Sequence, residues 1–180
     1  MAIEKTLSTK TVFKGRILRV DVVGVETADG VKSEREIVRH PGAAVILAQL
    51  PDGRFVFVRQ YRKAVELELL EVVAGTLESG EDPDACAARE LHEETGYKAA
   101  TLTKLGVAYP APGYTAEKLH IYFAKLQPEQ GGGTPDVDEH LDVVYLTAAE
   151  IERLISEGEM TDGKTLAAWL LYCRRILRKA

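Results

Sequence analysis

The chain has 180 residues, of which 46% are hydrophobic and 28% charged, and its formal net charge is −5. This is the composition of a globular protein with one domain and a small extension, and the acidic balance excludes a broad basic surface for nucleic acid. No apolar run approaches the roughly 18 residues that a membrane span requires, and residues 1–10 are too polar for a signal peptide. We therefore expect a cytoplasmic protein that binds neither nucleic acid nor a membrane.

Hydrophobic patterning predicts a series of strands in chain order. An alternating, β-branched pattern on either side of a turn at residues 28–30 predicts an N-terminal antiparallel β hairpin. A continuous apolar run at residues 43–50 predicts a strand that is buried on both faces. Residues 127–140 contain three glycines and two prolines without apolar periodicity, which predicts a mobile loop. Strands are predicted at residues 12–25, 34–39, 43–50, 55–58, 66–73, 102–108, 119–126 and 143–146.

Cap residues and apolar stripes predict three helices. The first covers residues 83–95, a capping-box pattern opens the second over residues 147–158, and an apolar stripe from residue 166 predicts a third that packs into the core. The elements together predict a mixed sheet flanked by helices, an α/β/α sandwich. Residues 1–42 would be an N-terminal β extension and residues 43–180 the main domain. The cap signals of the first helix are Asp82, Pro83 and Gly96.

The helix over residues 83–95 carries three carboxylates within a sector of about 100°. Arg89 lies at the edge of the same face, but one arginine cannot neutralise three carboxylates. Carboxylate oxygens are the ligands that Mg²⁺ and Mn²⁺ prefer, so this face predicts a site for a divalent metal ion. The three carboxylates are those of Glu90, Glu93 and Glu94.

The spacing of this segment is specific. Gly75, five residues, Glu81, seven residues and then Arg-Glu-Leu-x-Glu-Glu-x-Gly at residues 89–96 resembles the Nudix box at every fixed position. Tyr97 stands where that family usually places an aliphatic residue. The alternative is a solvated, glutamate-rich helix, but such a helix does not require an upstream glycine and glutamate at fixed offsets. The resemblance implies the Nudix fold, which is also an α/β/α sandwich with a mixed sheet.

Nudix enzymes, as a family, hydrolyse a nucleoside diphosphate linked to another group. The resemblance implies two or more divalent ions, Mg²⁺ or else Mn²⁺ or another metal, which would activate water for attack on phosphorus. Glu90 and Glu94 would be the primary ligands, with the Ala74 carbonyl as an additional one. Glu93 would bind a second ion or its water, and Glu78 would contribute there. Four further residues would be structural to the site: Gly75, Glu81, Arg89 and Gly96.

Segments outside the box resemble the ADP-ribose pyrophosphatase subgroup, whose members produce AMP and ribose 5-phosphate. These segments are residues 35–43, 58–62, 71–75 and 109–118. Pro112 stands where this subgroup has a proline fifteen residues beyond the box. One departure is Val73, where the subgroup usually has a proline. The resemblance therefore predicts a small-molecule nucleotide sugar, ADP-ribose, as the substrate.

Four charged residues are predicted to bind that substrate, together with Pro112. The Arg59 guanidinium can pair with two diphosphate oxygens. The resemblance implies contacts of Arg35 and Glu36 with the adenine or its ribose, and Glu117 could accept hydrogen bonds from the terminal ribose. The alternative for each residue is an ordinary surface charge at the end of a strand.

The carboxylates of the box are engaged with metal, so none of them is obviously free to act as the general base, and the resemblance implies a glutamate on the loop before the last strand. The resemblance favours Glu139, and Asp138 and Asp142 compete with it. A loop that carries a carboxylate over the substrate would also exclude other water. The alternative is a disordered acidic loop.

Members of this subgroup are usually homodimers in which the N-terminal strands complete the site of the partner subunit. Residues 1–42 are therefore expected to dimerise, with Arg35 or Glu36 acting across the interface. Two other functions remain open: hydrolysis of GDP-mannose or a UDP-sugar, and binding of a nucleotide without turnover by a regulator. The complete set of box carboxylates argues against the regulator. Cys86 and Cys173 lack zinc-ligand spacing and are expected to be free thiols.

Overall fold

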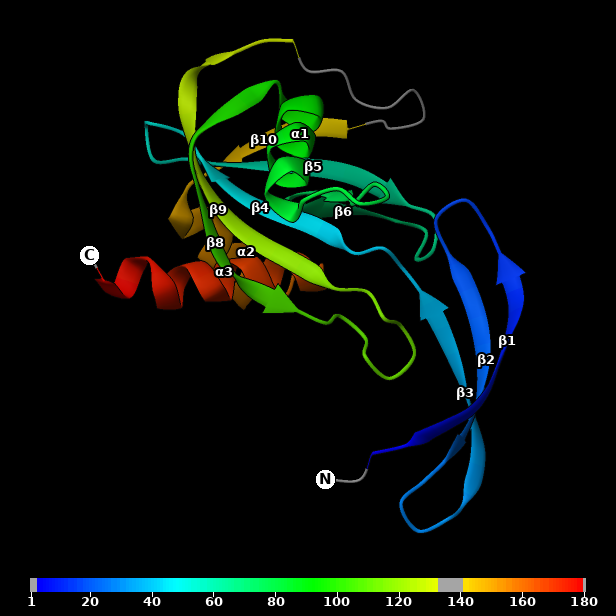
Figure 1. Ribbon diagram of the computed structural model, residues 1–180. Coiled ribbons are helices and arrows are strands. Elements are labelled where there is room, and N and C mark those ends of the chain that lie inside the picture. Colours follow the sequence, from blue (N-terminus) through cyan, green and yellow to red (C-terminus); the bar gives the residue numbers. More distant parts are fainter. Residues whose placement is uncertain (1–2, 133–140, 180) are drawn as a thin grey trace. The chain divides into compact units, whose positions relative to one another are not determined.

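The computed structural model describes residues 3–132 and 141–179 (Figure 1). The strands are β1 Lys5–Lys14, β2 Arg19–Glu26, β3 Lys32–Arg39, β4 Ala43–Gln49, β5 Phe55–Arg62, β6 Leu67–Glu71, β7 Val73–Thr76, β8 Tyr97–Ala108, β9 Leu119–Gln130 and β10 Leu141–Leu146. The helices are α1 Pro83–Thr95, α2 Ala148–Ser156, α3 Gly163–Arg175 and the short 3-10 helix η1 Leu177–Lys179. The chain divides into two compact units: Met1–Gly42 with Tyr109–Lys118, and Ala43–Ala108 with Leu119–Ala180.

The N-terminal unit is an antiparallel sheet in the order β1-β2-β3. The predicted hairpin is present as β2 and β3, but the prediction of one strand over residues 12–25 was wrong. The chain turns between β1 and β2, where the Gly15 N–H donates to the Leu18 carbonyl over 2.8 Å. All ten residues of β1 are exposed, so no apolar alternation in the sequence marks this strand.

The segment Tyr109–Lys118 belongs to the N-terminal unit although it is distant in sequence. The Val38 N–H of β3 donates to the Tyr114 carbonyl over 2.8 Å, and the Ala116 N–H donates to the Val38 carbonyl over 2.9 Å. This pairing brings the predicted substrate-binding segment beside the strand that carries Arg35 and Glu36.

The second unit contains a seven-stranded mixed sheet (Figure 1). Its main path is β10-β5-β4-β9-β8, with β6 paired to β5 and β7 paired to β4. The β4–β9 pair is parallel and the other pairs are antiparallel. Helix α1 packs on one face, while α2 and α3 pack on the other, because their buried residues fall in two separate clusters. The predicted α/β/α sandwich is confirmed.

Strand β4 explains how the two faces are filled. Val45 and Leu47 face the cluster that α2 and α3 cover, while Ala44 and Ile46 face the cluster that α1 covers. This alternation is the reason for the continuous apolar run, since neighbouring side chains of a strand point to opposite faces. The predicted strand with two buried faces is confirmed.

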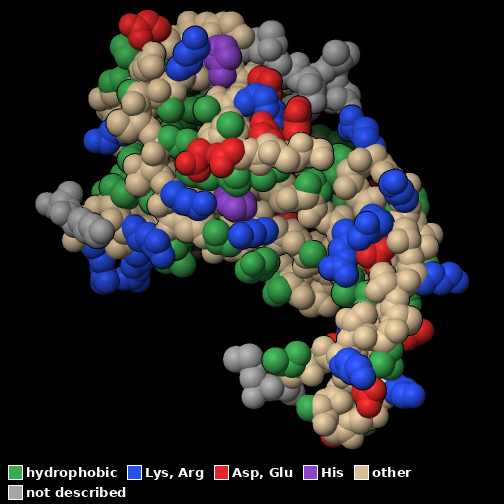
Figure 2. All heavy atoms as spheres, in the orientation of Figure 1, with side chains coloured by type: hydrophobic (Ala, Val, Ile, Leu, Met, Phe, Trp, Pro, Cys, Tyr) green, Lys and Arg blue, Asp and Glu red, His purple; other side chains and the backbone are tan. Residues whose placement is uncertain are grey.

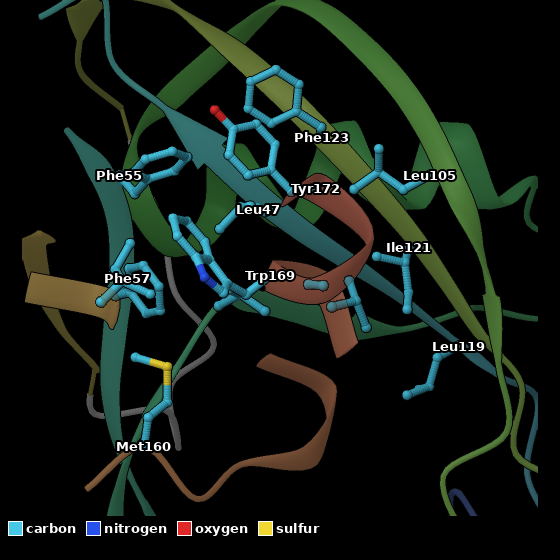
Figure 3. Close-up of a cluster of buried hydrophobic side chains, with 14 of the residues drawn as sticks. Leu47, Phe55, Phe57, Leu105, Leu119, Ile121, Phe123, Met160, Trp169 and Tyr172 are labelled. Carbon is cyan, nitrogen blue, oxygen red and sulfur yellow. The ribbon is translucent and has the colours of Figure 1, made fainter. Parts of the chain in front are cut away.

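Helix α3 supplies the aromatic part of the core (Figure 3). Trp169 and Tyr172 point toward Phe55 of β5, with ring centroids 5.3 Å and 5.4 Å away in edge-to-face arrangements. Edge-to-face pairs of this kind contribute roughly 0.5–1.5 kcal/mol each beyond their buried area. The apolar stripe of this helix is core, as its spacing predicts.

Two predicted boundaries differ from the structure in informative ways. Residues 66–73 form two strands rather than one, because Glu71 pairs with Val58 of β5 whereas Val73 pairs with Ile46 of β4. Strand β9 continues to Gln130, which the prediction assigned to a loop. Its backbone pairs with β8 there, and backbone pairing does not require apolar side chains. Among the described residues, no helix is long and apolar enough to cross a membrane.

Candidate active site

Helix α1 begins and ends at the predicted residues. The Asp82 side chain accepts a hydrogen bond from the Asp84 N–H over 2.8 Å, and Pro83 occupies the first helical position. Gly96 closes the helix with φ of 73°, a left-handed conformation that favours glycine. These caps fix which residues face the neighbouring strand β7. Figure 2 shows acidic side chains gathered over the region where α1 lies in Figure 1.

Gly75 of β7 lies directly against the Glu90 side chain. A Cβ atom at position 75 would lie 1.8 Å from the carboxyl carbon of Glu90, so that the Glu90 carboxyl group would have to move. A glycine at this position therefore permits the close approach of Glu90, and its φ angle is not the reason for it. The Glu90 carboxylate occupies the space that a side chain at position 75 would fill.

Arg89 connects three carboxylates around this point. Its Nε and Nη2 atoms donate to the two oxygens of Glu81, each over 2.9 Å. Its Nη1 atom donates to Glu90 Oε1 over 2.8 Å and to Glu93 Oε2 over 2.9 Å. The hydrogen bonds from Arg89 lower the pKa of Glu81 to about 2, with a smaller contribution from the Glu78 N–H. The ion pair between loop and helix that the box resemblance implies is present in the structure.

The remaining box residues lie on the same helix face and on the loop before it. Glu94 is buried, the Glu90 side chain is largely buried, and Glu93 is 38% exposed. Glu78 is exposed on the loop. Ala74 lies in β7 beside Gly75 and pairs with Val45 of β4. Of the predicted ligands, the structure thus places Glu90 of α1 against β7 at Gly75, the neighbour of Ala74.

The donor chemistry of this cluster fits a hard divalent cation. Oxygens of Glu90 and Glu93 already converge on one cationic nitrogen, Arg89 Nη1. In the described parts of the chain, however, no three acidic, histidine or cysteine side chains are yet gathered closely enough to hold a metal ion. Metal binding would therefore compete with the two contacts that Arg89 Nη1 makes.

Four of the predicted substrate-binding residues lie in the N-terminal unit. Arg35 donates to the Ser33 hydroxyl and pairs with Glu4, and Glu36 is exposed on the same strand. Glu117 Oε1 lies 3.8 Å from His40 Nδ1, which itself accepts a hydrogen bond from the Gly42 N–H over 3.1 Å. The fourth residue, Pro112, is exposed.

Arg59 lies in β5 of the second unit, directly opposite Asp142 of β10. Strand alternation puts Arg59 on the face of Phe57, which α2 and α3 cover, whereas α1 covers the face of Val58. Asp142 shares the face of Arg59 because it is its cross-strand partner. The structure brings these two predicted residues together, on the opposite face of the sheet from α1. Glu139 and Asp138, the other candidates for the base, lie outside the described residues.

Arg62 is a guanidinium that the sequence analysis did not single out. Its Nε and Nη2 atoms donate to the two oxygens of buried Glu71 over 2.8 Å and 2.6 Å. These hydrogen bonds raise the pKa of Arg62, and the negative charge of Glu94 adds to the effect. Arg62 is therefore within electrostatic reach of Glu94 in α1. Because Arg62 shares the strand parity of Val58, alternation along β5 places it on the face that α1 covers, unlike Arg59.

Comparison with known proteins gives a consistent result. A family model described as NUDIX domain matches residues 38–169. The chain is 42% identical over 166 residues to a methanol dehydrogenase activator of Bacillus methanolicus and 39% identical over 166 residues to an ADP-ribose pyrophosphatase of Bacillus subtilis. Each match covers 92% of this chain and 90% of the relative.

Two further similarities extend the comparison. A GDP-mannose pyrophosphatase of Yersinia enterocolitica is 33% identical over 174 residues, covering 91% of this chain and 90% of that protein. The crystal structure of an ADP compounds hydrolase superimposes with a TM-score of 0.83 at 26% identity, covering 98% of this chain and 96% of that one. The likeness thus extends over nearly the whole chain.

Proposed function

This chain belongs to the Nudix family of hydrolases, and we propose that it hydrolyses ADP-ribose to AMP and ribose 5-phosphate. The observation that carries this proposal is the carboxylate cluster of α1, with Glu90 seated against Gly75 and Arg89 joined to Glu81. The ADP-ribose pyrophosphatase relative and the ADP compounds hydrolase structure support the choice of substrate.

Glu90 and Glu94 are the proposed primary metal ligands, and the Ala74 carbonyl is an additional one. Glu93 and Glu78 serve a second ion. Two or more ions of Mg²⁺, Mn²⁺ or a similar metal would neutralise the diphosphate and activate water for attack on phosphorus. The carboxylates of α1 would contribute negative charge to metal binding. Because Glu90 and Glu94 are already buried, their side chains lose little conformational entropy when the metal binds.

Arg89 and Gly75 shape the site without contacting the substrate. Arg89 holds the loop at Glu81 through two hydrogen bonds, and this contact does not depend on whether Nη1 keeps Glu90 and Glu93. Gly75 keeps open the space for Glu90. Gly96 ends α1 directly after the box, so that Tyr97 can begin β8.

Glu139 is the proposed general base that takes the proton from the attacking water. Asp142 is the weaker candidate, because it shares the sheet face of Phe57 and α3 rather than that of α1. Asp138, the neighbour of Glu139, is the remaining competitor. Replacing each carboxylate separately with its amide would identify the base, since loss of the base lowers kcat more than it raises KM.

Substrate recognition is proposed to involve the N-terminal unit. Arg35 and Glu36 would contact the adenosine part, while Pro112 and Glu117 would contact the terminal ribose. Arg62 is proposed to bind the diphosphate together with Arg59, because Arg62 lies within electrostatic reach of Glu94. A cytoplasmic homodimer, in which Arg35 or Glu36 acts across the interface, completes the proposal.

One comparison favours a second candidate function. Because a relative that is 42% identical is described as a methanol dehydrogenase activator, the second candidate is that this chain activates a methanol dehydrogenase. Addition of the purified protein to such a dehydrogenase would then raise its turnover. A Glu94→Gln variant separates the two activities, since it removes hydrolysis but leaves the surface of the protein unchanged.

A substrate panel tests the main proposal. The purified protein is incubated with Mg²⁺ and, separately, ADP-ribose, GDP-mannose, UDP-glucose, NADH and diadenosine polyphosphates, and the products are separated by ion exchange. The proposal predicts AMP and ribose 5-phosphate, formed fastest from ADP-ribose and abolished by a chelator. Faster cleavage of GDP-mannose would contradict ADP-ribose as the preferred substrate and assign the activity to GDP-sugars. Cleavage of none would contradict hydrolysis as the function.

A further inference from the structure

The junction between β6 and β7 has an unusual anchor. Val72 belongs to neither strand, because the chain there leaves its pairing with β5 and begins its pairing with β4. Its N–H donates instead to the hydroxyl of Thr165 in α3 over 2.9 Å, a contact between residues 93 positions apart. Both residues are fully buried. A side chain of a distant helix therefore satisfies a backbone group that the sheet leaves without a partner.

The N-terminus of α3 fixes the direction of this hydroxyl. Asp162 caps the helix by accepting from the Thr165 N–H over 2.9 Å, and its Oδ2 atom also accepts from the Thr165 hydroxyl over 2.6 Å. Since the single hydroxyl proton is directed to Asp162, a lone pair remains for the Val72 N–H. The cap of α3 and the strand junction thus share one hydrogen-bonded chain.

A second contact ties the same helix end to the same junction. Lys164 donates to Asp162 over 3.0 Å and also pairs with Glu71, the residue before Val72. Glu71 is 1% exposed and is held from its other side by Arg62. Two consecutive residues of the junction are therefore bound by two consecutive residues of α3.

The other end of this segment is anchored from the opposite face of the sheet. The Cys86 thiol of α1 lies 3.8 Å from the Gly75 carbonyl, and Arg89 Nη2 lies 3.5 Å from the Thr76 carbonyl. Residues 72–76 are thus held at their start by α3 and at their end by α1. Ala74, whose carbonyl is the proposed metal ligand, lies between the two anchors.

We propose that Thr165 is a positioning residue for the metal site, acting through the Val72 N–H to fix the backbone at Ala74 and Gly75. This inference rests on the proposed function, because it takes the Ala74 carbonyl as a ligand. Without the Thr165 hydroxyl, the buried Val72 N–H loses its acceptor, and the junction can recover one only by moving. Such movement would displace Ala74, two residues away, although Thr165 touches neither metal nor substrate.

The test compares Thr165→Val, which keeps the shape of the side chain but removes the hydroxyl, with Thr165→Ser, which keeps the hydroxyl. Mn²⁺ binding is measured by electron paramagnetic resonance without substrate, at a temperature well below the unfolding midpoint of each variant. The proposal predicts about tenfold weaker Mn²⁺ binding for Thr165→Val, as for other residues that orient metal ligands. Thr165→Ser should bind Mn²⁺ within about twofold of the wild type, since its hydroxyl can make both hydrogen bonds.

Wild-type Mn²⁺ affinity in folded Thr165→Val, with only a lower unfolding temperature, would show that the contact is merely structural and would overturn the proposal. If Thr165→Val does not fold, Thr165→Ala replaces it, because it removes the same hydroxyl and therefore the same acceptor of the Val72 N–H. Weaker Mn²⁺ binding by Thr165→Ala supports the proposal, and unchanged binding contradicts it. Wild-type protein that binds Mn²⁺ but does not cleave ADP-ribose would overturn the substrate assignment while leaving this inference intact.

Discussion

The α1 cluster and the N-terminal sheet place their functional side chains in opposite environments. In the cluster, Glu90 is packed against Gly75 and Arg89 holds it with two other carboxylates, so that each position is determined by contacts. In the N-terminal sheet, all of β1 is exposed and Glu36 projects from an exposed position. The comparison teaches that packing and ion pairs hold the α1 carboxylates in place, whereas the residues predicted to recognise the substrate on β3 lie at exposed or half-buried positions.

The largest expected effect is in the cluster. Glu94→Gln should lower kcat/KM for ADP-ribose at least about 100-fold, because a neutral amide is a poor ligand for a hard cation. Circular dichroism should show an unchanged fold. Glu68→Gln serves as the matched control, since Glu68 is exposed on β6, and it should keep wild-type activity. Near-normal turnover by Glu94→Gln would remove Glu94 from the ligand set.

A somewhat smaller loss is expected for Gly75→Ala, which tests preorganisation without removing a ligand. The added Cβ would overlap the Glu90 carboxyl group and force it aside, so activity should fall about 10- to 100-fold. Raising the Mg²⁺ concentration should restore part of the loss. Gly131→Ala is the control, because a Cβ there meets nothing within 4 Å. If both variants were equally active, the close approach at Gly75 would be irrelevant to catalysis.

The N-terminal surface should respond differently. Glu36→Ala should raise KM for ADP-ribose about 3- to 30-fold and change kcat little, because a lost recognition contact weakens binding of the ground state and of the transition state alike. Glu34→Ala, at an exposed position on the same strand, should leave KM unchanged. Sedimentation should show a dimer. A stable monomer with full activity would contradict the proposed role of Arg35 and Glu36 across the subunit interface.

The smallest effect concerns the pH response of the N-terminal sheet. A hydrogen bond from the Thr11 hydroxyl, followed by bonds from Arg39 and Arg19, lowers the pKa of Asp21 below its ordinary 3.8. The ionised Asp21 carboxylate therefore stabilises the folded N-terminal sheet above pH 3.8. This stabilisation is lost as the pH falls through the pKa that Asp21 has in the folded state.

Amide hydrogen exchange in β1 to β3, divided by the intrinsic exchange rate at each pH, should accordingly become slightly faster as the pH is lowered through this range. In Asp21→Asn this acid-dependent loss of protection against exchange should disappear. An identical pH dependence in the variant and the wild type would mean that Asp21 does not couple the sheet to pH.

The contrast between the packed α1 cluster and the exposed N-terminal sheet also explains which features could be predicted from the sequence. Helix α1 was predictable to the residue, because its end signals are local: the Asp82 side chain caps the start, and the left-handed backbone of Gly96 closes the end. The core stripe of α3 was predictable for a similar reason, since its periodicity reflects burial against one sheet face. Strand β1 was not, because an edge strand with no buried side chain leaves no apolar pattern.

Other features depend on partners that are distant in sequence. The change of strand partner at Val72 and its bond to Thr165 cannot be read from residues 66–73, whose apolar pattern continues through the junction. The choice between Arg59 and Arg62 depends on which face of β5 α1 covers, and this became clear only with the packing of Val58. The assignment of the base to Glu139 stays a prediction.

The most direct test of the central claim is hydrolysis of ADP-ribose in ¹⁸O-labelled water with Mg²⁺, followed by mass spectrometry of the products. The account predicts AMP and ribose 5-phosphate, with one label in the phosphate of one product, and no reaction after Glu94→Gln. Products without label in either phosphate would contradict water attack on phosphorus. The absence of both products from an Mg²⁺-loaded, folded protein would contradict the proposed activity itself.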